Sequence, residues 1–448
     1  MNFNDTIVAS ATPYGYGGLA VVRLSGGNSK YIAQQICRRN KSFIDRRATV
    51  ASLYGSDSEP YDNAVVTYFK NPNSYTGEDV VEFSCHGSPA IVEKTIKLAI
   101  NLGARSAEPG EYTRRAFTNG RIDLVQAESV AAIIHGRGEK TAQLNHRVLS
   151  GELSKKLNDI KKTILETLSY VEFELDISED ELLPDTIQRV KHNINSAYTG
   201  MSALAESFNE GRLLNSGASV VICGPPNAGK STLFNALLNE NKAIVSPTPG
   251  TTRDLLEAEV LYDGISVVLS DTAGMRKPKE TIESEGVRRA EEKLKHADFI
   301  LNVFDLEQPV PISTFSQNGN SIPVLNKCDL YDINQIKKVK SEMSGCICIS
   351  AKEGNGLNDI KDSIKKGLHI SGNLSDNVFL ITQRQYDIVN SCLRFLKSAL
   401  QLIVAGSVSF ELLSVEIRGA LDAVDRILGK TTSEEILNNI FSNFCVGK

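Results

Sequence analysis

The feature that most constrains this chain is the segment GPPNAGKS, Gly224–Ser231, which matches the pattern GxxxxGK[ST]. It follows the apolar run SVVIC and precedes the helix-like stretch STLFNALLN, the strand–loop–helix context of a phosphate-binding loop. Gly224 and Gly229 let the backbone wrap closely around a phosphate, and the helix N-terminus adds its dipole. The motif predicts that Lys230 reaches the β- and γ-phosphates of a nucleotide and that Ser231 binds magnesium.

Two further motifs place candidate ligands around the phosphates. GTTRD, Gly250–Asp254, predicts that Thr252 holds magnesium when a γ-phosphate is present. DTAG, Asp271–Gly274, follows the apolar run SVVLS and directs Asp271 toward the magnesium shell and the Gly274 amide toward the γ-phosphate. Each motif alone also fits an ordinary turn, but the ordered set favours a nucleotide site.

Two motifs later in the chain predict recognition of guanine. NKCD, Asn326–Asp329, follows the apolar run IPVL, and Asp329 can accept hydrogen bonds from the ring NH and the amino group of guanine. Adenine offers no such pair, and a site left with unpaired polar groups discriminates strongly against it. SAK, Ser350–Lys352, predicts a backbone amide at the guanine oxygen. The motifs therefore predict a site that selects GTP over ATP.

The residue after DTAG constrains the mechanism of hydrolysis. Ras-like proteins place a water-orienting glutamine there, whereas this chain has Met275, whose thioether cannot orient water. Two residues are candidates for the missing function: Asn227 could hold a monovalent cation beside the phosphates, and Glu283 could position or deprotonate the water. Taken alone, Glu283 is more readily explained as a solvated carboxylate in the first turn of a helix.

The pattern along the chain indicates several domains, because 448 residues exceed the usual size of one. The runs TIVASAT, GGLAVVRLSG and NAVVTYF indicate strands in the first part of the chain, with helical stretches near Lys30–Cys37 and Ala90–Leu102, and helical periodicity follows. Strands and helices then alternate before the helical pattern returns. We predict a multidomain α/β and α protein: an N-terminal α+β domain at 1–118, a discontinuous helical domain at 119–216 and 371–448, and an inserted Ras-like P-loop GTPase domain with a doubly wound, mostly parallel sheet at 217–370.

Composition limits the location and the partners. The formal net charge is -5, so a nucleic-acid partner would need a local basic patch or help from another protein. The eight cysteines form no CxxC pair and show no zinc-type spacing, which favours free thiols in a reducing compartment. The N-terminus lacks the features of a signal peptide, and no apolar run reaches the roughly 18 residues of a membrane span. We expect a cytoplasmic protein with no membrane partner.

Five groups of segments, taken in order, resemble the MnmE (TrmE) family of tRNA-modification GTPases over essentially the whole chain. They are NDTIVASATP with GYGGLAVVRLSG, NSYTGEDVVEFSCHGSP, PGEYTRRAFTNGRIDLVQAE, PNAGKST with GTTRD, and the terminal FCVGK. One such string would be a weak signal, but five in order, with the domain plan above, are specific.

The resemblance implies an activity and partners. MnmE-like proteins form a heterotetramer with an FAD-dependent partner, MnmG (also called GidA), and add a carboxymethylaminomethyl-type group to carbon 5 of the wobble uridine of certain tRNAs. The one-carbon unit comes from a tetrahydrofolate derivative, in its formyl or methylene form. The N-terminal domain binds this derivative and forms the homodimer. The GTPase domains are activated by potassium and meet across the dimer.

The resemblance also assigns roles to residues. The positions that match folate contacts are Arg23, Glu82, Arg121 and Lys448, and Arg121 stands where the family often has lysine, which keeps the charge but changes the geometry. The positions that match potassium ligands are Asn227, Ser246, Thr248 and Thr251. Glu283 matches the family's catalytic glutamate, which reverses the preference stated above, and Cys445 matches the family's terminal cysteine. The residues predicted to be catalytic are Glu283, Lys230 and Cys445.

Taken together, the motifs and the resemblance predict a continuous set of GTP contacts. The set is Asn227, Ala228, Gly229, Lys230, Ser231, Thr232, Ser246, Pro247, Thr248, Pro249, Gly250, Thr251, Thr252, Asp271, Thr272, Ala273, Gly274, Asn326, Lys327, Asp329, Ser350, Ala351 and Lys352.

Three other interpretations explain the sequence less well. A GTP-switched ribosome-assembly factor of the Era type would share the nucleotide motifs, but it would not explain the N-terminal strings or the terminal FCVGK. A scaffold that binds GTP without turnover is disfavoured by the intact Lys230, Ser231, Thr252 and Asp271. The adjacent Cys85 and His86 do not form a catalytic dyad, because neighbouring residues of a strand point to opposite faces.

Overall fold

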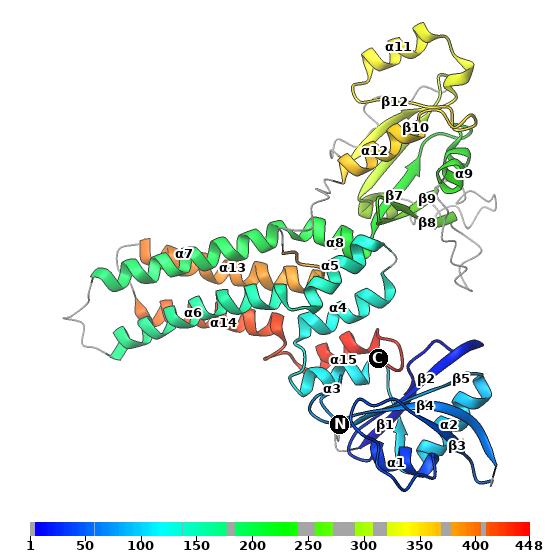
Figure 1. Cartoon of the computed structure of the whole chain (residues 1–448). Coiled ribbons are helices and arrows are strands. Elements are labelled where there is room, and N and C mark those ends of the chain that lie inside the picture. Colours follow the sequence, from blue (N-terminus) through cyan, green and yellow to red (C-terminus); the bar gives the residue numbers. More distant parts are fainter. Residues whose placement is uncertain are drawn as a thin grey trace, which may run out of the picture. The chain divides into compact units, whose positions relative to one another are not determined.

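The computed structural model describes residues 5–57, 59–136, 138–176, 184–240, 256–271, 292–307, 320–368, 378–404 and 409–448 (Figure 1). The chain divides into two compact units. The first comprises Met1–Ile134, Val148–Tyr198 and Ser391–Lys448, and the second comprises His135–Arg147 and Thr199–Asn390. Within the described ranges, no helix is long and apolar enough to cross a lipid bilayer.

The first unit begins with a six-stranded sheet in the order β3-β4-β5-β2-β1-β6. All its neighbours are antiparallel except β1 and β6. Its strands are β1 (Thr6–Ser10), β2 (Gly17–Ser25), β3 (Thr49–Tyr54), β4 (Pro60–Phe69), β5 (Val80–Gly87) and β6 (Ala104–Ser106). The helices α1 (Ser29–Ile36) and α2 (Pro89–Asn101) complete this α+β domain, as the sequence pattern predicts.

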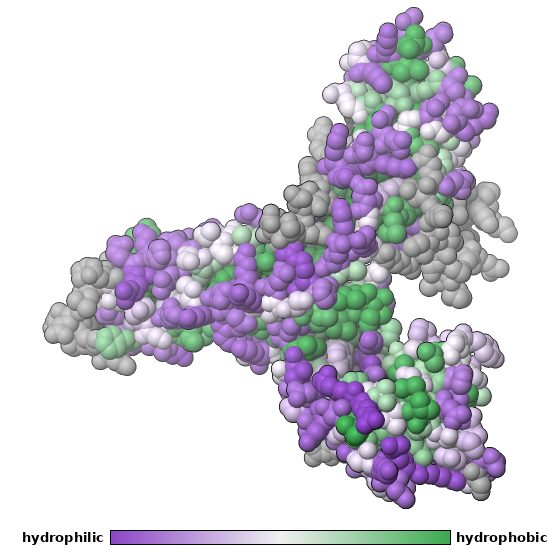
Figure 2. All heavy atoms as spheres, in the orientation of Figure 1, coloured by the Kyte–Doolittle hydropathy of each residue, from purple (hydrophilic) through white to green (hydrophobic). Residues whose placement is uncertain are grey.

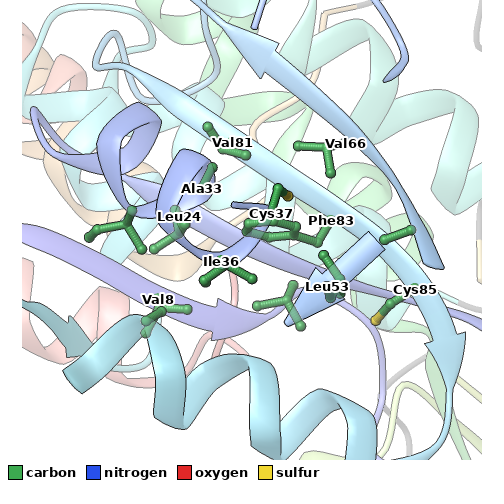
Figure 3. Packing of buried hydrophobic residues seen from close by; sticks show 14 of the residues in the cluster. Val8, Leu24, Ala33, Ile36, Cys37, Leu53, Val66, Val81, Phe83 and Cys85 are labelled. Atoms are coloured by element: carbon green, nitrogen blue, oxygen red, sulfur yellow. The ribbon is translucent and has the colours of Figure 1, made fainter. Parts of the chain in front are cut away.

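The apolar residues of the strands and of α1 form the core of this domain (Figure 3). In β2 the side chains of Val22 and Leu24 are fully buried, while Arg23 between them belongs to the other face of the sheet. The same alternation buries Cys85 on β5 and leaves the next side chain, His86, 68% exposed beside Asp62. This confirms that Cys85 and His86 point to opposite faces.

Helices make up the rest of the first unit. The bounds are α3 (Glu111–Thr118), α4 (Leu124–His135), α6 (Glu152–Asp176), α14 (Phe410–Leu428) and α15 (Glu434–Ser442); α7 (Pro184–Glu206) and α13 (Gln383–Val404) continue into the second unit. Arg418 on α14 pairs with Glu172 on α6 at 2.6 Å. The C-terminal α15 packs on α3, where the rings of Phe117 and Phe441 are 6.2 Å apart. The chain end is thereby fixed beside the N-terminal domain.

The second unit contains a six-stranded sheet in the order β12-β11-β10-β7-β9-β8. All its neighbours are parallel except β8 and β9, which confirms the predicted mostly parallel sheet. Its strands are β7 (Ala218–Cys223), β8 (Leu256–Tyr262), β9 (Ile265–Asp271), β10 (Phe299–Phe304), β11 (Ser321–Leu325) and β12 (Ile347–Cys348). The predicted nucleotide motifs follow β7, β9, β11 and β12, so they gather at one edge of the sheet.

Helices of the second unit flank this sheet. They are α5 (Glu139–Leu149, its last two residues in the first unit), α8 (Phe208–Ser216), α9 (Lys230–Glu240), α11 (Ile333–Glu342) and α12 (Leu357–Gly367). Of these, α8 and α9 pack against the sheet. In α12 the buried residues are Leu357, Ile360 and Ile364, and Figure 2 shows hydrophilic residues over its visible face. All eight cysteines are free thiols, as the sequence predicts, and Cys346 and Cys348 are half-buried beside and within β12.

Candidate functional site

The phosphate loop connects β7 to α9, and its geometry requires glycine at two positions. Gly224 has a φ of 143°, and a Cβ there would lie 1.9 Å from the carbonyl oxygen of Val303. Gly229 has a φ of 87°, and a Cβ there would lie 2.2 Å from Nδ2 of Asn326. Any larger residue at either position would collide with these neighbours. The two glycines of the motif are therefore needed for the loop itself as well as for the approach of a phosphate.

Two side chains of the loop are held at the start of α9. Lys230 is buried, and its Nζ donates a hydrogen bond of 2.7 Å to the carbonyl oxygen of Pro225. The hydroxyl of Ser231 donates to Oδ2 of Asp271 at 2.7 Å, and Asp271, at the end of β9, is fully buried. The structure thus brings together two oxygen ligands from different motifs. A hydroxyl and a carboxylate beside a phosphate site are the hard donors that magnesium prefers, so the residues fit that ion.

The side chain of Asn326 connects the phosphate loop to the predicted guanine loop. Its Nδ2 donates to the carbonyl oxygen of Ala228 at 2.9 Å, and its Oδ1 accepts from the backbone amide of Ala351 at 3.0 Å. All three residues are buried. One amide side chain therefore holds GPPNAGKS and SAK in a fixed mutual position.

The two guanine motifs also contact each other directly. The amide of Cys328 donates to the carbonyl oxygen of Ile349 at 3.0 Å. A hydrogen bond from the Ser350 hydroxyl lowers the pKa of the exposed Asp329 below its ordinary value. The carboxylate of Asp329 is exposed and open to a ligand. These contacts hold the loop that carries Asp329, the carboxylate that the sequence predicts for guanine recognition.

Lys327 has a buried partner that the sequence analysis missed. Its Nζ lies 2.6 Å from Oδ2 of Asp305, a carboxylate that is 4% exposed. The hydrogen bond from Lys327 to Asp305 raises the pKa of the lysine. Its position in the sequence could have identified Asp305 as a site residue, because it directly follows the apolar run FILNVF of β10, at the same sheet edge as the other motifs.

Several predicted nucleotide residues lie outside the described residues. They are the switch positions Ser246, Pro247, Thr248, Pro249, Gly250, Thr251 and Thr252, the DTAG positions Thr272, Ala273 and Gly274, and Glu283. Of the predicted potassium ligands, the structure places Asn227, which is exposed and has a φ of 64°. Thr232, on α9, and Lys352, the last residue of SAK, are also exposed.

A second cluster lies on the first unit, where β2 and β5 pair. The strand register sets Arg23 opposite Glu82, and Nε of Arg23 donates to Oε1 of Glu82 at 2.8 Å. Nη1 of Arg23 also donates to the carbonyl oxygen of Gly447 at 3.2 Å. From α3, the hydroxyl of Tyr112 donates to the backbone oxygen of Arg23 at 2.7 Å. The structure therefore joins two of the predicted folate positions and the last residues of the chain.

The chain end completes this cluster. Gly447 has a φ of 95°, and a Cβ there would lie 2.1 Å from the carbonyl oxygen of Ser10, so the tail fits closely against β1. Burial, together with repulsion from Arg23, lowers the pKa of Lys448. Cys445 is exposed close by. The fourth predicted folate residue, Arg121, lies beside Gly77, and no described contact joins it to Arg23, Glu82 or Lys448.

Comparisons with known proteins cover both sites. A family model described as "MnmE helical domain" matches residues 124–445, and one described as "GTP-binding protein TrmE N-terminus" matches residues 6–121. The tRNA modification GTPase MnmE of Aquifex aeolicus is 37% identical over 99% of this chain and 100% of its own. The MnmE of Chlorobium phaeovibrioides is 38% identical over 99% of this chain and 98% of its own. The MnmE of Legionella pneumophila is 37% identical over 99% of each chain.

The chain belongs to the MnmE family. The match extends through the N-terminal domain, the helices and the nucleotide site, so the family resemblance stated from the motifs is confirmed. Among solved structures, the G domain of the FeoB iron transporter of T. maritima covers 34% of this chain and 98% of its own, with 23% identity and a TM-score of 0.26. That likeness is too small to bear on function.

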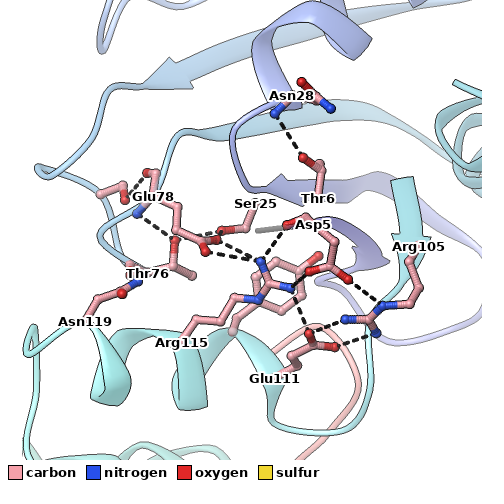
Figure 4. Close-up of polar contacts among 12 residues, drawn as sticks. Asp5, Thr6, Ser25, Asn28, Thr76, Glu78, Arg105, Glu111, Arg115 and Asn119 are labelled. Atoms are coloured by element: carbon pink, nitrogen blue, oxygen red, sulfur yellow. Dashed lines mark hydrogen bonds and ion pairs between the residues drawn. The ribbon is translucent and has the colours of Figure 1, made fainter. Parts of the chain in front are cut away.

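In this MnmE-family chain the N-terminal domain also holds a charge network that the sequence analysis missed (Figure 4). Arg115 is 1% exposed and contacts three carboxylates: Asp5 at 2.6 Å, Glu111 at 2.9 Å and Glu78 at 3.1 Å. Arg105 pairs with Asp5 at 2.8 Å and with Glu111 at 2.6 Å. The network fixes α3, which carries Tyr112, and so supports the backbone of Arg23. Its members are far apart in the sequence and form no motif, which is why the pattern did not reveal them.

Proposed function

We propose that this protein hydrolyses GTP and acts in tRNA modification, the activity in the names of its relatives. The observation that carries the first part is the contact of Asn326 with both Ala228 and Ala351, which builds phosphate and guanine recognition into one site. The second part rests on family membership over the full length of the chain. An assembly factor of the Era type would share only the nucleotide motifs.

For hydrolysis, a water oxygen attacks the γ-phosphorus, the bond from that phosphorus to the bridging oxygen breaks, and GDP and phosphate leave. Lys230 would donate to the phosphate oxygens in place of the Pro225 carbonyl, its partner in this structure, and so stabilise the developing charge. Magnesium, held by Ser231 and Thr252, would supply further charge neutralisation when bound. We assign Glu283 to positioning the water.

Potassium is the proposed activator, and Asn227 is its ligand on the described part of the chain. A carbonyl oxygen beside the phosphates can hold a monovalent cation that substitutes for an arginine finger. The exposed position of Asn227 in the phosphate loop is compatible with that role. The other proposed ligands are Ser246, Thr248 and Thr251.

The cluster of Arg23, Glu82 and Lys448 is the proposed site for a formyl- or methylene-tetrahydrofolate. Two cations and one carboxylate, held by the strand register and by the chain end, offer donors and an acceptor to a ligand that has both carboxylates and a polar ring. The residues therefore fit the group. When bound, the folate would supply a one-carbon unit, and Arg121 and Cys445 remain proposed contributors.

The same proposal includes the chemical group that is added to the tRNA and the proteins that take part. The protein would act as a homodimer in the cytoplasm, together with the FAD-dependent MnmG. The pair would place a carboxymethylaminomethyl-type group on carbon 5 of the wobble uridine.

Nucleotide choice tests the GTPase part. Asp329→Asn should weaken GTP binding about 100-fold or more, because the carboxylate that pairs with guanine is lost. The variant should gain affinity for xanthosine triphosphate, since an amide can pair with the ring carbonyl of xanthine. Glu353→Gln, an equal charge change at a neighbouring exposed residue, is the matched control. Unchanged GTP affinity in Asp329→Asn, measured by calorimetry, would exclude the guanine site.

A further inference from the structure

A concentration of positive charge extends from α1 toward β3, and neither the nucleotide site nor the folate cluster uses it. The stretch from Ser29 to Arg47 contains one carboxylate, Asp45, and six basic side chains, a formal charge of +5 in a chain whose net charge is -5. We call these six residues the basic segment: Lys30, Arg38, Arg39, Lys41, Arg46 and Arg47. The acidic balance of the whole chain conceals this local excess.

The backbone that carries the basic segment is fixed to the N-terminal domain. Cys37 and Phe43 are buried in the core, at 7% and 3% exposure, on either side of the first arginine pair (Figure 3 shows Cys37). The amide of Arg46 donates to the carbonyl oxygen of Tyr68 at 2.7 Å, next to a bridge between Asp45 and Tyr68. The charges therefore stand on a structured surface.

Neutral groups hold several of these cations. The guanidinium carbon of Arg38 lies 4.8 Å from the ring centre of Tyr54, and its Nη2 donates to the backbone oxygens of Gly55 and Asp57 at 3.0 and 2.7 Å. Arg39 lies over Phe43 at 5.4 Å. Rings and carbonyl oxygens orient a guanidinium without cancelling its charge.

Arg46 follows the same pattern, over the ring of Phe69 at 6.0 Å and with a hydrogen bond of 2.5 Å to the carbonyl oxygen of Asn73. Among the described residues, the one ion pair that the basic segment makes joins Arg46 to Asp45 at 4.0 Å. Both side chains are largely exposed, at 60% and 41%, so the pair is weak. Most of the positive charge is thus left for an external anion.

We propose that the basic segment binds the phosphate backbone of the tRNA, an inference that rests on the proposed function. Several cations spread along a structured surface suit an extended chain of phosphates, since each neutralised phosphate releases condensed counterions. Oriented guanidiniums also bind phosphate oxygens with geometry that a mobile side chain lacks. The segment positions the RNA and leaves recognition of the modified base to other parts of the assembly.

The test uses the full-length protein and purified tRNA. Lys41 and Arg47 are exposed, and their side chains make no hydrogen bond or ion pair with a described residue, so Lys41→Glu/Arg47→Glu changes charge with little structural cost. Fluorescence anisotropy should show at least about tenfold weaker binding at roughly 100 mM salt, with a shallower salt dependence. Lys41→Gln/Arg47→Gln should lie between this variant and the wild type. GTP turnover without tRNA should be unchanged in both.

The control is Lys337→Glu/Lys340→Glu, an equal charge change on exposed positions of α11, which should bind tRNA like the wild type. Equal tRNA binding by the wild type and both basic-segment variants would overturn the inference and leave the proposed function standing. Failure of the wild type to bind tRNA, with GTP hydrolysis intact, would contradict the tRNA part of the proposed function as well. Variants that lose binding to anionic phosphatidylserine vesicles but keep tRNA binding would instead make the segment a membrane surface and overturn the inference.

Discussion

The side-chain amide of Asn326 donates a 2.9 Å hydrogen bond to the backbone oxygen of Ala228, inside the phosphate loop. The same side chain accepts a hydrogen bond from the amide of Ala351, in the loop predicted to contact guanine. A disturbance at either end of the nucleotide therefore reaches the other end through one buried residue. Binding of the base and binding of the phosphates should accordingly be coupled.

Asn326→Ala should weaken GTP and GDP alike. The change leaves a buried donor and a buried acceptor without their partner, at about 1–3 kcal/mol for each group. Asn326→Asp keeps the acceptor for Ala351 but places a carboxylate against the Ala228 oxygen, so it should be as harmful. Calorimetry gives the affinities, with the exposed Asn320→Ala as the control. A variant that lost GTP affinity but kept that for GDP would show that the two loops are not coupled in this way.

GTP turnover should be faster in potassium than in sodium, because the smaller sodium ion fits the same ligands poorly. Asn227→Gly should abolish the difference, since it removes the side-chain oxygen while accepting the φ of 64° that Asn227 adopts. Asn227→Asp, which keeps an oxygen, should retain it. Phosphate release, measured in chloride salts of equal ionic strength, decides the matter. Equal rates for the wild type in both salts would remove the potassium site.

Tetrahydrofolate binding should depend on the Arg23–Glu82 pair. Arg23→Ala or Glu82→Ala should weaken it substantially, because each change removes one ligand contact and leaves the other half of a partly buried ion pair without its partner. The GTPase activity should be nearly unaffected. Calorimetry must use the full-length protein, since Lys448 and Gly447 belong to the cluster. Wild-type folate affinity in both variants would rule out this site.

Acid should loosen α3 through the buried charge network. Burial raises the pKa of Glu111, but hydrogen bonds from Arg105, the Glu108 amide and Arg115 outweigh it, so the pKa is lowered overall. Its stabilising contribution is therefore complete above an unfolded pKa of about 4.3 and is lost as the pH falls through the lower folded value. Glu111→Gln should raise hydrogen exchange in α3 at neutral pH and flatten its acid dependence.

The exposed Glu108→Gln is the control for the network. Removing one partner of a buried charge pair typically costs about 3–5 kcal/mol, which is large enough to see in the exchange of α3 amides by mass spectrometry. If Glu111→Gln and Glu108→Gln exchanged alike at neutral pH, the network would not be what fixes α3.

Local sequence patterns predicted the elements and motifs well. Apolar alternation and helical spacing located β1, β2, β4, α1 and α2, and the motif context located the phosphate loop between β7 and α9. The reason is that these features depend on neighbours in the chain. The Ser231–Asp271 contact could also be inferred, because the strand ends that carry the two motifs meet at one edge of a parallel sheet.

Contacts between distant residues could not be predicted in the same way. Asp305 as the partner of Lys327, and the contacts of Arg115 with Asp5, Glu78 and Glu111, depend on where separate elements meet. The role proposed for the basic segment could not be predicted from the sequence, because each of its cations is ordinary for a surface. Its meaning comes from the rings and carbonyls that the fold places beside them.

The role in tRNA modification can be measured by nucleoside mass spectrometry of tRNA from a strain without this gene. Carbon-5 modification of the wobble uridine should be lost in the deletion strain and restored by the wild-type chain. Glu283→Ala should not restore it, because its hydrolysis should be slower by roughly 100-fold or more and the nucleotide cycle would stall. Normal tRNA modification in the strain that carries Glu283→Ala would show that modification does not depend on GTP hydrolysis. Unchanged wobble uridines in the deletion strain would contradict the account itself.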